Sequence, residues 1–234
     1  MRLRWNIEEV IIVLRIAIVG FGGVGRAFLK LLQDKQEYLK NEGLEPVVNY
    51  VMNSRGGIYK DDGINIKHFL EFLKTNDNIK DYHYGTSNYI TFDYMLQNND
   101  VDFLVEMTPT NKITGEPGMT YIKKALGNGI NVVTSNKGPI LLAYKKLKQL
   151  AKANNVQLGI GCTTGGALPT INGGIMDLAG SDILSIEGVL NGTTNFIIDE
   201  IEKNNVIYKE ALLKAQQQGI AETDPSLDVE GWDT

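Results

Sequence analysis

Three glycines near the start of the chain have the spacing of an anion-binding turn. They form the pattern Gly20-x-Gly22-x-x-Gly25, which follows a run of branched aliphatic residues and precedes a stretch with helical periodicity. Glycine permits a tight turn and a close approach of the backbone to a phosphate. The N-terminus of the next helix then offers free N–H groups and the positive end of its dipole. The spacing predicts a dinucleotide pyrophosphate site made by Gly20, Phe21, Gly22, Gly23, Val24 and Gly25.

A second polar stretch follows the next strand-like segment. Asn53, Ser54 and Arg55 come directly after residues 46–52, PVVNYVM. Folds that select NAD commonly have an acidic residue at this strand end to bind the ribose 2′-hydroxyl, and these three positions have none. Arg55 could instead pair with the 2′-phosphate of NADP, so we expect NADP to bind at least as well as NAD. The alternative is that Arg55 is an ordinary solvated loop arginine.

Polar residues also follow two later strand-like segments. Residues 101–107 (VDFLVEM) and 130–134 (INVVT) are each followed by a polar turn. Ligands of open α/β sheets bind beyond the carboxyl ends of the strands, where both turns would lie. We therefore expect further cofactor contacts from Thr108, Pro109, Ser135 and Lys137.

Lys137 is also the best candidate for a catalytic group. Hydride transfer to a carbonyl requires a side chain that exchanges a proton with the substrate oxygen. A lysine at the ligand-binding edge of the sheet suits that role. The alternative is that Lys137 only belongs to the first turn of a helix.

The last fourteen residues, 221–234 (AETDPSLDVEGWDT), are acidic. They contain Glu222, Asp224, Asp228, Glu230 and Asp233. Carboxylates gathered in this way could bind the amino group of a substrate. The alternative is a solvated acidic loop.

The elements that carry these residues alternate between strand and helix. A helix after the glycines should bury an apolar face made of Val24, Phe28, Leu31 and Leu32. Further helices are expected over residues 117–126 and from Pro139 onwards. Strands are expected at 15–19, 46–52, 101–107, 130–134 and 156–160. This alternation predicts the α/β class, as a Rossmann-type doubly wound parallel sheet.

The composition changes after this sheet. Residues 161–174 (GCTTGGALPTINGG) are rich in glycine and threonine and predict a crossover into a second, α+β domain. We expect a strand at 185–190, a tight turn at Asn191-Gly192, a helix capped by Thr193-Thr194, and a second helix over 207–218. The predicted organisation is an extension at 1–14, a nucleotide-binding domain at 15–161 and a substrate domain at 162–234.

The overall composition fits a globular enzyme of the cytoplasm. Of 234 residues, 43% are hydrophobic and 22% charged, and the net charge of -5 argues against nucleic acid or an anionic membrane as partner. The single cysteine, Cys162, indicates a reducing compartment. The N-terminal segment lacks a signal peptide pattern because Glu8 and Glu9 precede its apolar run. His68 and His83 have no metal-ligand spacing around them.

Taken together, five motifs resemble the homoserine dehydrogenase family. They are IAIVGFGGVGRAFL, NVVTSNKGPI, TTGGALP, GVLNGTTNFI and AETDPSLDVEGWD, and they cover residues 15–233 in the family's order. The last two are the more specific, because nucleotide binding alone does not require them. The resemblance implies reversible, NAD(P)-dependent reduction of L-aspartate 4-semialdehyde to L-homoserine, in the biosynthetic branch leading to threonine, methionine and isoleucine.

The resemblance also implies roles for individual residues. It implies catalytic roles for Lys137, Glu222 and Asp233. It implies that a small-molecule amino acid substrate is bound by Gly192, Thr193, Glu222, Asp228 and Asp233. The full-length enzyme is expected to be a homodimer.

Two departures from the family pattern qualify these expectations. Gly161 stands where the family commonly has a glutamate of a monovalent cation site, so we expect no metal. The family also has a second catalytic lysine shortly after the position of Asp233, and this sequence ends at Thr234. We therefore expect an incomplete substrate domain, with dinucleotide binding but little turnover. The alternatives are a related amino acid dehydrogenase, such as aspartate dehydrogenase, or a catalytically silent dinucleotide-binding protein.

Overall fold

The computed structural model describes residues 11–88, 90–189, 191–221, 225 and 226. The chain divides into two compact units between Thr163 and Thr164, two residues after the predicted domain boundary. Each unit is described by itself below.

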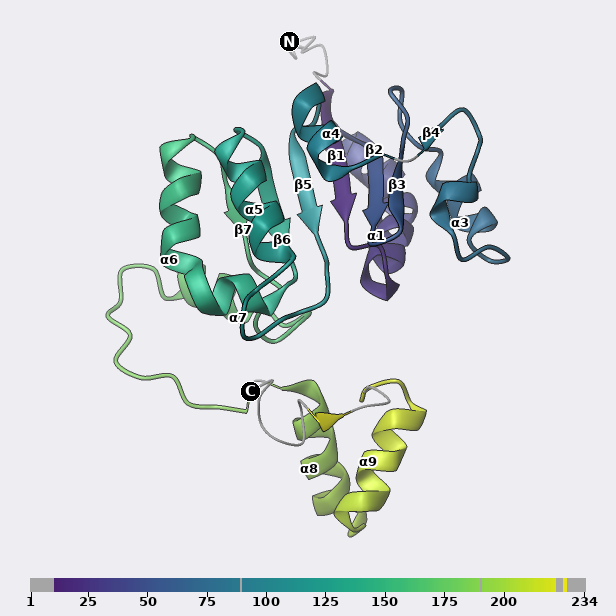
Figure 1. The fold of residues 1–234 in the computed structure, drawn as a ribbon. Coiled ribbons are helices and arrows are strands. Elements are labelled where there is room, and N and C mark those ends of the chain that lie inside the picture. Colours follow the sequence, from purple (N-terminus) through teal and green to yellow (C-terminus); the bar gives the residue numbers. More distant parts are fainter. Residues whose placement is uncertain (1–10, 89, 190, 222–224, 227–234) are drawn as a thin grey trace, which may run out of the picture. The chain divides into compact units, whose positions relative to one another are not determined.

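Seven strands form one sheet in the described part of the first unit (Figure 1), in the order β4-β3-β2-β1-β5-β6-β7. The strands are β1 (Ile12–Val19), β2 (Leu44–Asn53), β3 (Gly56–Tyr59), β4 (Ser87–Asn88), β5 (Phe103–Glu106), β6 (Asn131–Thr134) and β7 (Leu158–Gly159). The pairs within β2-β1-β5-β6-β7 are parallel, which confirms the predicted doubly wound sheet. The antiparallel edge formed by β3 and β4 was not predicted.

β1 begins earlier than the sequence indicated. Ile12 pairs with Leu44 and Leu14 with Pro46 in the parallel ladder, so residues 12–14 belong to the strand and not to an extension. The prediction began the strand at Arg15 and assigned residues 1–14 to an extension. The Arg15 backbone N–H donates to the Asp102 carboxylate at 2.8 Å, and the Arg15 side chain does not interrupt the ladder.

Helices cover both faces of the sheet. They are α1 (Gly23–Asp34), α2 (Gln36–Asn41), α3 (Ile66–Phe72), the short 3-10 helix η1 (Ile79–Asp81), α4 (Phe92–Asn98), α5 (Gly118–Gly127) and α6 (Lys137–Ala153). Side chains alternate along β1: Ile16 and Ile18 pack in the core on the α1 and α3 side. Ala17 and Val19 pack in the core on the α4, α5 and α6 side. The buried parallel strands therefore carry apolar residues on both faces.

The buried face of α1 differs from the predicted one. Leu29 is fully buried, with Phe28 and Leu32 packed beside it, whereas Val24 and Leu31 are exposed. The spacing of apolar residues alone allowed either face. The close contact of Gly25 with the preceding turn fixes which face lies on the sheet.

α6 and β7 also begin or end at other residues than the sequence predicted. α6 begins at Lys137, two residues before Pro139, because the Asn136 side chain caps it by accepting a hydrogen bond from the Gly138 N–H at 3.1 Å. Pro139 lies in the first turn, where its missing N–H costs nothing. β7 is limited to two residues within the predicted 156–160.

The regular elements described in the second unit are helices. It contains α7 (Thr170–Asp177), α8 (Gly192–Asn204) and α9 (Tyr208–Gln217). Ile197 of α8 packs with Ala211 and Ala215 of α9 and with Ala221. None of the described helices of the chain is long and apolar enough to cross a bilayer.

Two predictions for this unit were wrong. Residues 185–189 form no strand, because a strand needs a hydrogen-bonding neighbour and the described residues supply none here. Asn191-Gly192 is the start of α8 and not a tight turn. Asn191 caps the helix by accepting from the Thr194 N–H at 2.7 Å, a role that was expected of Thr193 and Thr194.

The orientation of α1 predicts that replacing leucine with alanine at two positions of this helix lowers the free energy of unfolding by different amounts. Leu29→Ala should lower the free energy of unfolding by about 2–5 kcal/mol, because it empties a fully buried site. Leu31→Ala is the matched control, since it has the same helix and the same chemistry but an exposed side chain, and it should cost less than about 0.5 kcal/mol. Urea unfolding measures both, and equal losses would contradict the observed face.

Candidate functional site

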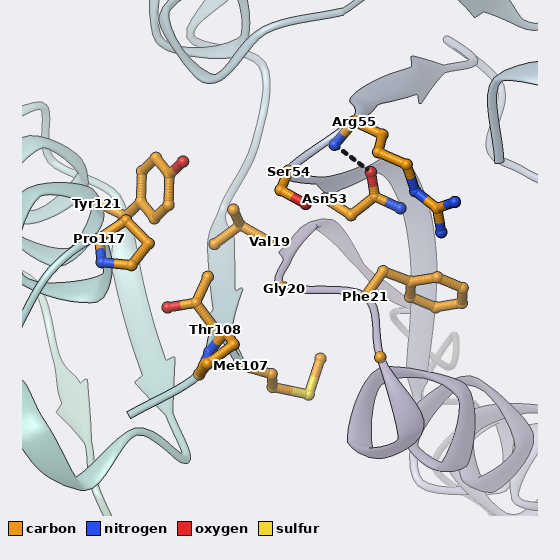
Figure 2. A pocket seen from close by; sticks show the side chains of 12 residues that line it. Val19, Gly20, Phe21, Asn53, Ser54, Arg55, Met107, Thr108, Pro117 and Tyr121 are labelled. Atoms are coloured by element: carbon orange, nitrogen blue, oxygen red, sulfur yellow. Dashed lines mark hydrogen bonds between the residues drawn. The ribbon is translucent and has the colours of Figure 1, made fainter. Parts of the chain in front are cut away.

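A cavity of about 310 Å³ lies at the carboxyl ends of β1, β2 and β5. Figure 2 shows Asn53, Ser54 and Arg55 on one side of it and Pro117 and Tyr121 on the other. The described residues that line it are Val19, Gly20, Phe21, Gly22, Asn53, Ser54, Arg55, Met107, Thr108, Pro109, Pro117 and Tyr121. The cavity is therefore located where ligands of doubly wound sheets bind.

Gly20 closes the turn at the floor of the cavity. Its φ of +88° favours glycine, and a Cβ atom there would lie 2.3 Å from the backbone carbon of Met107 and the backbone nitrogen of Thr108. Any larger residue would push the end of β1 away from the end of β5. The first glycine of the motif is required by this contact between two backbones.

The other two motif glycines have different roles. A Cβ atom at Gly25 would lie 2.9 Å from the Phe21 ring, so Gly25 allows α1 to pack against the turn. At Gly22 and Gly23 no atom lies within 4 Å of such a Cβ, and both positions face open space. Gly22 is also the N-cap of α1, whose first N–H groups have no partner inside the helix. This open helix N-terminus is suited to a phosphate group.

The turn between β2 and β3 forms the polar wall. The Asn53 side-chain oxygen accepts a hydrogen bond from the Arg55 N–H at 2.9 Å, drawn as a dashed line in Figure 2. The Arg55 guanidinium donates to the carbonyl oxygen of Asp77 at 3.2 Å. Arg26 of α1 lies 3.7 Å from the Asp77 carboxylate and donates to the Leu73 carbonyl at 3.1 Å. Among the described lining residues, Arg55 is the charged one.

The opposite wall depends on an acidic residue that the sequence analysis did not single out. Glu106, the last residue of β5, is fully buried directly behind Thr108. Its backbone oxygen also accepts from the Ser135 N–H at 3.1 Å. The signal available in the sequence was an acidic residue inside the apolar run VDFLVEM.

The structure brings most of the expected cofactor residues together. Gly20, Phe21, Gly22, Asn53, Ser54, Arg55, Thr108 and Pro109 all line the cavity. Gly23, Val24 and Gly25 form the first turn of α1, next to it. Ser135 and Lys137 are not among the lining residues. Lys137 is the exposed first residue of α6.

Four lining residues were missed. Val19 and Met107 are strand-end residues whose pattern indicated only core. Pro117 and Tyr121 belong to the start of α5 and to its first turns. The ring of Tyr121 packs against Phe92, with ring centres 4.6 Å apart. Nothing in the local sequence showed that these two residues face the glycine turn.

The expected substrate residues belong to the second unit. Gly192 is the first residue of α8, with open space where a Cβ would lie. Thr193 is buried, and its hydroxyl donates to the Ile220 carbonyl at 3.2 Å. Glu222, Asp228 and Asp233 lie outside the described residues. In the part of the chain that is described, no group of three His, Cys, Asp or Glu side chains could hold a metal ion.

Two family models match this chain. The model for the homoserine dehydrogenase NAD binding domain matches residues 20–160, and the homoserine dehydrogenase model matches residues 169–234. The first match contains every described lining residue of the cavity except Val19, and the second covers the three described helices of the second unit.

Individual proteins agree with the family models. The chain is 41% identical to a homoserine dehydrogenase of Methanocaldococcus jannaschii and 34% identical to an NAD(+)-dependent homoserine dehydrogenase of Pseudomonas canavaninivorans. Each comparison covers 94% of this chain, and 65% and 62% of the two relatives. A hyperthermophilic archaeal homoserine dehydrogenase in complex with NADPH superposes with a TM-score of 0.77 at 29% identity, over 95% of this chain and 66% of that one.

This chain thus spans slightly less than two thirds of the length of these two curated relatives. The relatives and the two family models cover residues of both compact units, and the glycine turn lies in the first unit. The chain belongs to the homoserine dehydrogenase family.

Proposed function

We propose that this protein is an NAD(P)-dependent homoserine dehydrogenase, which interconverts L-aspartate 4-semialdehyde and L-homoserine. The observation that carries the proposal is the cavity over the Gly20–Gly25 turn, in a chain whose relatives include an NAD(+)-dependent enzyme and an NADPH complex. In this proposal residues 15–161 bind the cofactor and residues 162–234 bind the substrate.

The residues of the cavity fit a dinucleotide. Gly22 and Gly23 leave open space at the N-terminus of α1, and a Cβ atom at either position would reduce that space. A pyrophosphate bound there would be stabilised by the free N–H groups of the helix. Asn53, Ser54 and Arg55 would hold the adenosine ribose and its 2′ substituent. Thr108 and Pro109 would contact the cofactor at the end opposite its adenosine. When bound, the cofactor supplies or accepts a hydride.

Lys137 is proposed as the group that exchanges a proton with the substrate oxygen. Reduction adds a hydride to the aldehyde carbon and a proton to its oxygen, so the chain must provide a proton donor. Lys137 is exposed at the first position of α6, and the preceding residue, Asn136, fixes that position by capping the helix. The amino group is therefore carried by a well-defined backbone at the ligand-binding edge of the sheet.

The second unit is proposed to hold the amino acid part of the substrate. Gly192 would present its backbone to the substrate, because nothing lies near its Cβ position. Thr193 would hold the Gly192 backbone in place through the hydrogen bond from its hydroxyl to the Ile220 carbonyl. Glu222, Asp228 and Asp233 are proposed to bind the ammonium group, with Glu222 and Asp233 also assisting catalysis. The match of residues 169–234 to the family model supports this assignment.

We also propose a cytoplasmic homodimer with no nucleic acid or membrane partner. The acidic net charge of -5 and the single cysteine support the compartment and the absence of those partners. The dimer is supported by large apolar side chains that are exposed in the second unit. These include Met176, Leu184 and Ile186, with 76%, 96% and 77% exposure.

The polar wall of the cavity predicts the cofactor preference. Arg55→Ala should weaken NADP binding by about 1–3 kcal/mol, because a charge-assisted contact to the 2′-phosphate is lost, and should leave NAD binding nearly unchanged. Isothermal titration calorimetry with both cofactors measures this difference. Arg26→Ala is the matched control, because Arg26 also contacts Asp77 but does not line the cavity. It should change both affinities by the same factor, and an equal loss for both in the Arg55 variant would contradict the assignment.

The proposed ammonium site predicts substrate discrimination. The full-length enzyme should oxidise homoserine with a kcat/KM on the order of 10⁴ times that for 4-hydroxybutyrate. The second alcohol lacks the amine, and binding it would leave the carboxylates of the site without their cationic partner. Nicotinamide absorbance follows both reactions. Glu222→Gln should reduce the ratio of the two kcat/KM values. Glu230→Gln changes an acidic residue with no assigned role and should leave that ratio unchanged.

Other outcomes of the same assay identify the alternatives. Similar rates with both alcohols would indicate an alcohol dehydrogenase without an ammonium site. Activity with aspartate in place of homoserine would indicate an aspartate dehydrogenase. Cofactor binding with neither activity would indicate a catalytically silent dinucleotide-binding protein.

A further inference from the structure

Glu106 is an acidic residue in a position that is otherwise apolar. It is the last residue of β5, an interior strand of the sheet, and it is 0% exposed. Burying a carboxylate is unfavourable unless its oxygens are fully hydrogen-bonded. The mechanism described above does not use Glu106, so its burial requires an explanation.

The carboxylate is held by neutral donors from two segments. Oε1 accepts from the Thr108 N–H at 2.8 Å, from the Thr108 hydroxyl, and from the Asn136 side-chain amide at 3.3 Å. Oε2 accepts from the Thr134 hydroxyl at 2.6 Å. One side chain therefore joins the cavity wall that follows β5 to the residues that end β6 and start α6.

The direction of each hydrogen bond is fixed by Asn136. Its backbone N–H donates to the Thr134 hydroxyl oxygen at 2.9 Å, and its side-chain amide donates to the Thr108 hydroxyl oxygen at 3.2 Å. Both hydroxyls accept from Asn136 and therefore turn their protons towards Glu106. The network needs an acceptor at both Glu106 oxygens, which is what a carboxylate supplies.

The surrounding backbone is shaped to the same side chain. A Cβ atom at Gly118, the first residue of α5, would lie 3.0 Å from Glu106 Oε1 and 2.5 Å from the Asn136 amide nitrogen. Gly118 therefore lets the N-terminus of α5 approach the carboxylate, and the positive end of that helix dipole favours a negative charge. The Asn136 amide nitrogen also reaches the Pro109 carbonyl at 3.5 Å.

We propose that Glu106 is a positioning residue for the cofactor: its buried carboxylate holds the Thr108–Pro109 wall of the cavity in register with Asn136 and the start of α6. This inference rests on the proposed function, because the cavity must bind NAD(P) for the wall to matter. Glu106 acts through Thr108 and Asn136 and makes no contact with the ligand itself.

Glu106→Gln is the sharpest test, since glutamine has the same shape but replaces one acceptor oxygen with a donor. Thr108 and Thr134 then cannot both keep their hydroxyl protons directed at this side chain. We expect NADP to bind about ten- to a hundredfold more weakly, the range for hydrogen bonds to a charged group. Calorimetry well below the melting temperature measures affinity of the folded protein, so a loss of stability alone leaves the dissociation constant unchanged.

Tyr50→Phe is the matched control for a lost buried hydrogen bond. The Tyr50 hydroxyl donates to the Asp100 carboxylate at 2.9 Å and accepts from the Asn98 amide at 3.0 Å, near the amino end of β5. Burial raises the pKa of Tyr50, so this hydroxyl remains a donor. This variant should lower the melting temperature without changing the affinity for NADP.

A double-mutant cycle with Thr108→Val shows whether Glu106 acts through Thr108. If it does, the combined variant loses clearly less affinity than the product of the two single factors. Wild-type affinity for NADP in Glu106→Gln would overturn the proposal. So would a double variant whose loss of affinity equals the product of the losses in the two single variants. Failure of the unsubstituted protein to bind NADP would instead overturn the proposed function.

A second variant serves if Glu106→Gln does not fold. Thr134→Val removes the donor to Oε2 but does not alter a lining residue. It should weaken NADP binding about threefold or more, in line with one neutral hydrogen bond. Unchanged affinity in this folded variant would equally overturn the proposal.

Discussion

The contact between the Gly20 turn and the end of β5 is the constraint on which the candidate site depends. The Gly20 N–H donates to the Met52 carbonyl at 3.0 Å, and the Met107 N–H donates to the Val19 carbonyl at 2.8 Å. The end of β1 is thus bonded to both neighbouring strands. The two backbones approach so closely that only glycine fits, and the cavity, its polar wall and the N-terminus of α1 all take their positions from this point.

The charges around the cavity are arranged in opposite ways on its two sides. Arg55 is a cation at an open wall, where it can meet an anionic group of a ligand. Glu106 is a carboxylate with no exposure, stabilised by hydrogen bonds from hydroxyl and amide groups and by the N-terminus of α5. A surface charge recognises a ligand, whereas a buried charge held by rigid donors fixes the protein groups around it. The proposed roles therefore assign one ionic group of the site to ligand binding and the other to positioning the cavity wall.

The second unit shows how much a local pattern depends on its surroundings. Residues 185–189 have the composition of a strand, yet no neighbouring strand is present among the described residues, and Leu184 and Ile186 are exposed. α8 and α9, by contrast, form as expected, because their hydrogen bonds are internal and they bury Ile197, Ala211 and Ala215 against each other. Helices could be predicted here and the strand could not.

The sequence by itself determined the features that depend on near neighbours in the chain: the glycine turn, the alternation of strands and helices, and the polar strand ends at Asn53 and Thr108. Tertiary structure alone decided that Leu29 and not Leu31 is buried, that β3 and β4 extend the sheet, and that Tyr121 lines the cavity. It also decided that Glu106 joins Thr108 to Asn136, residues 28 positions apart. Periodicity and spacing report contacts within one element, whereas burial and hydrogen bonding between elements exist only once the strands are aligned side by side.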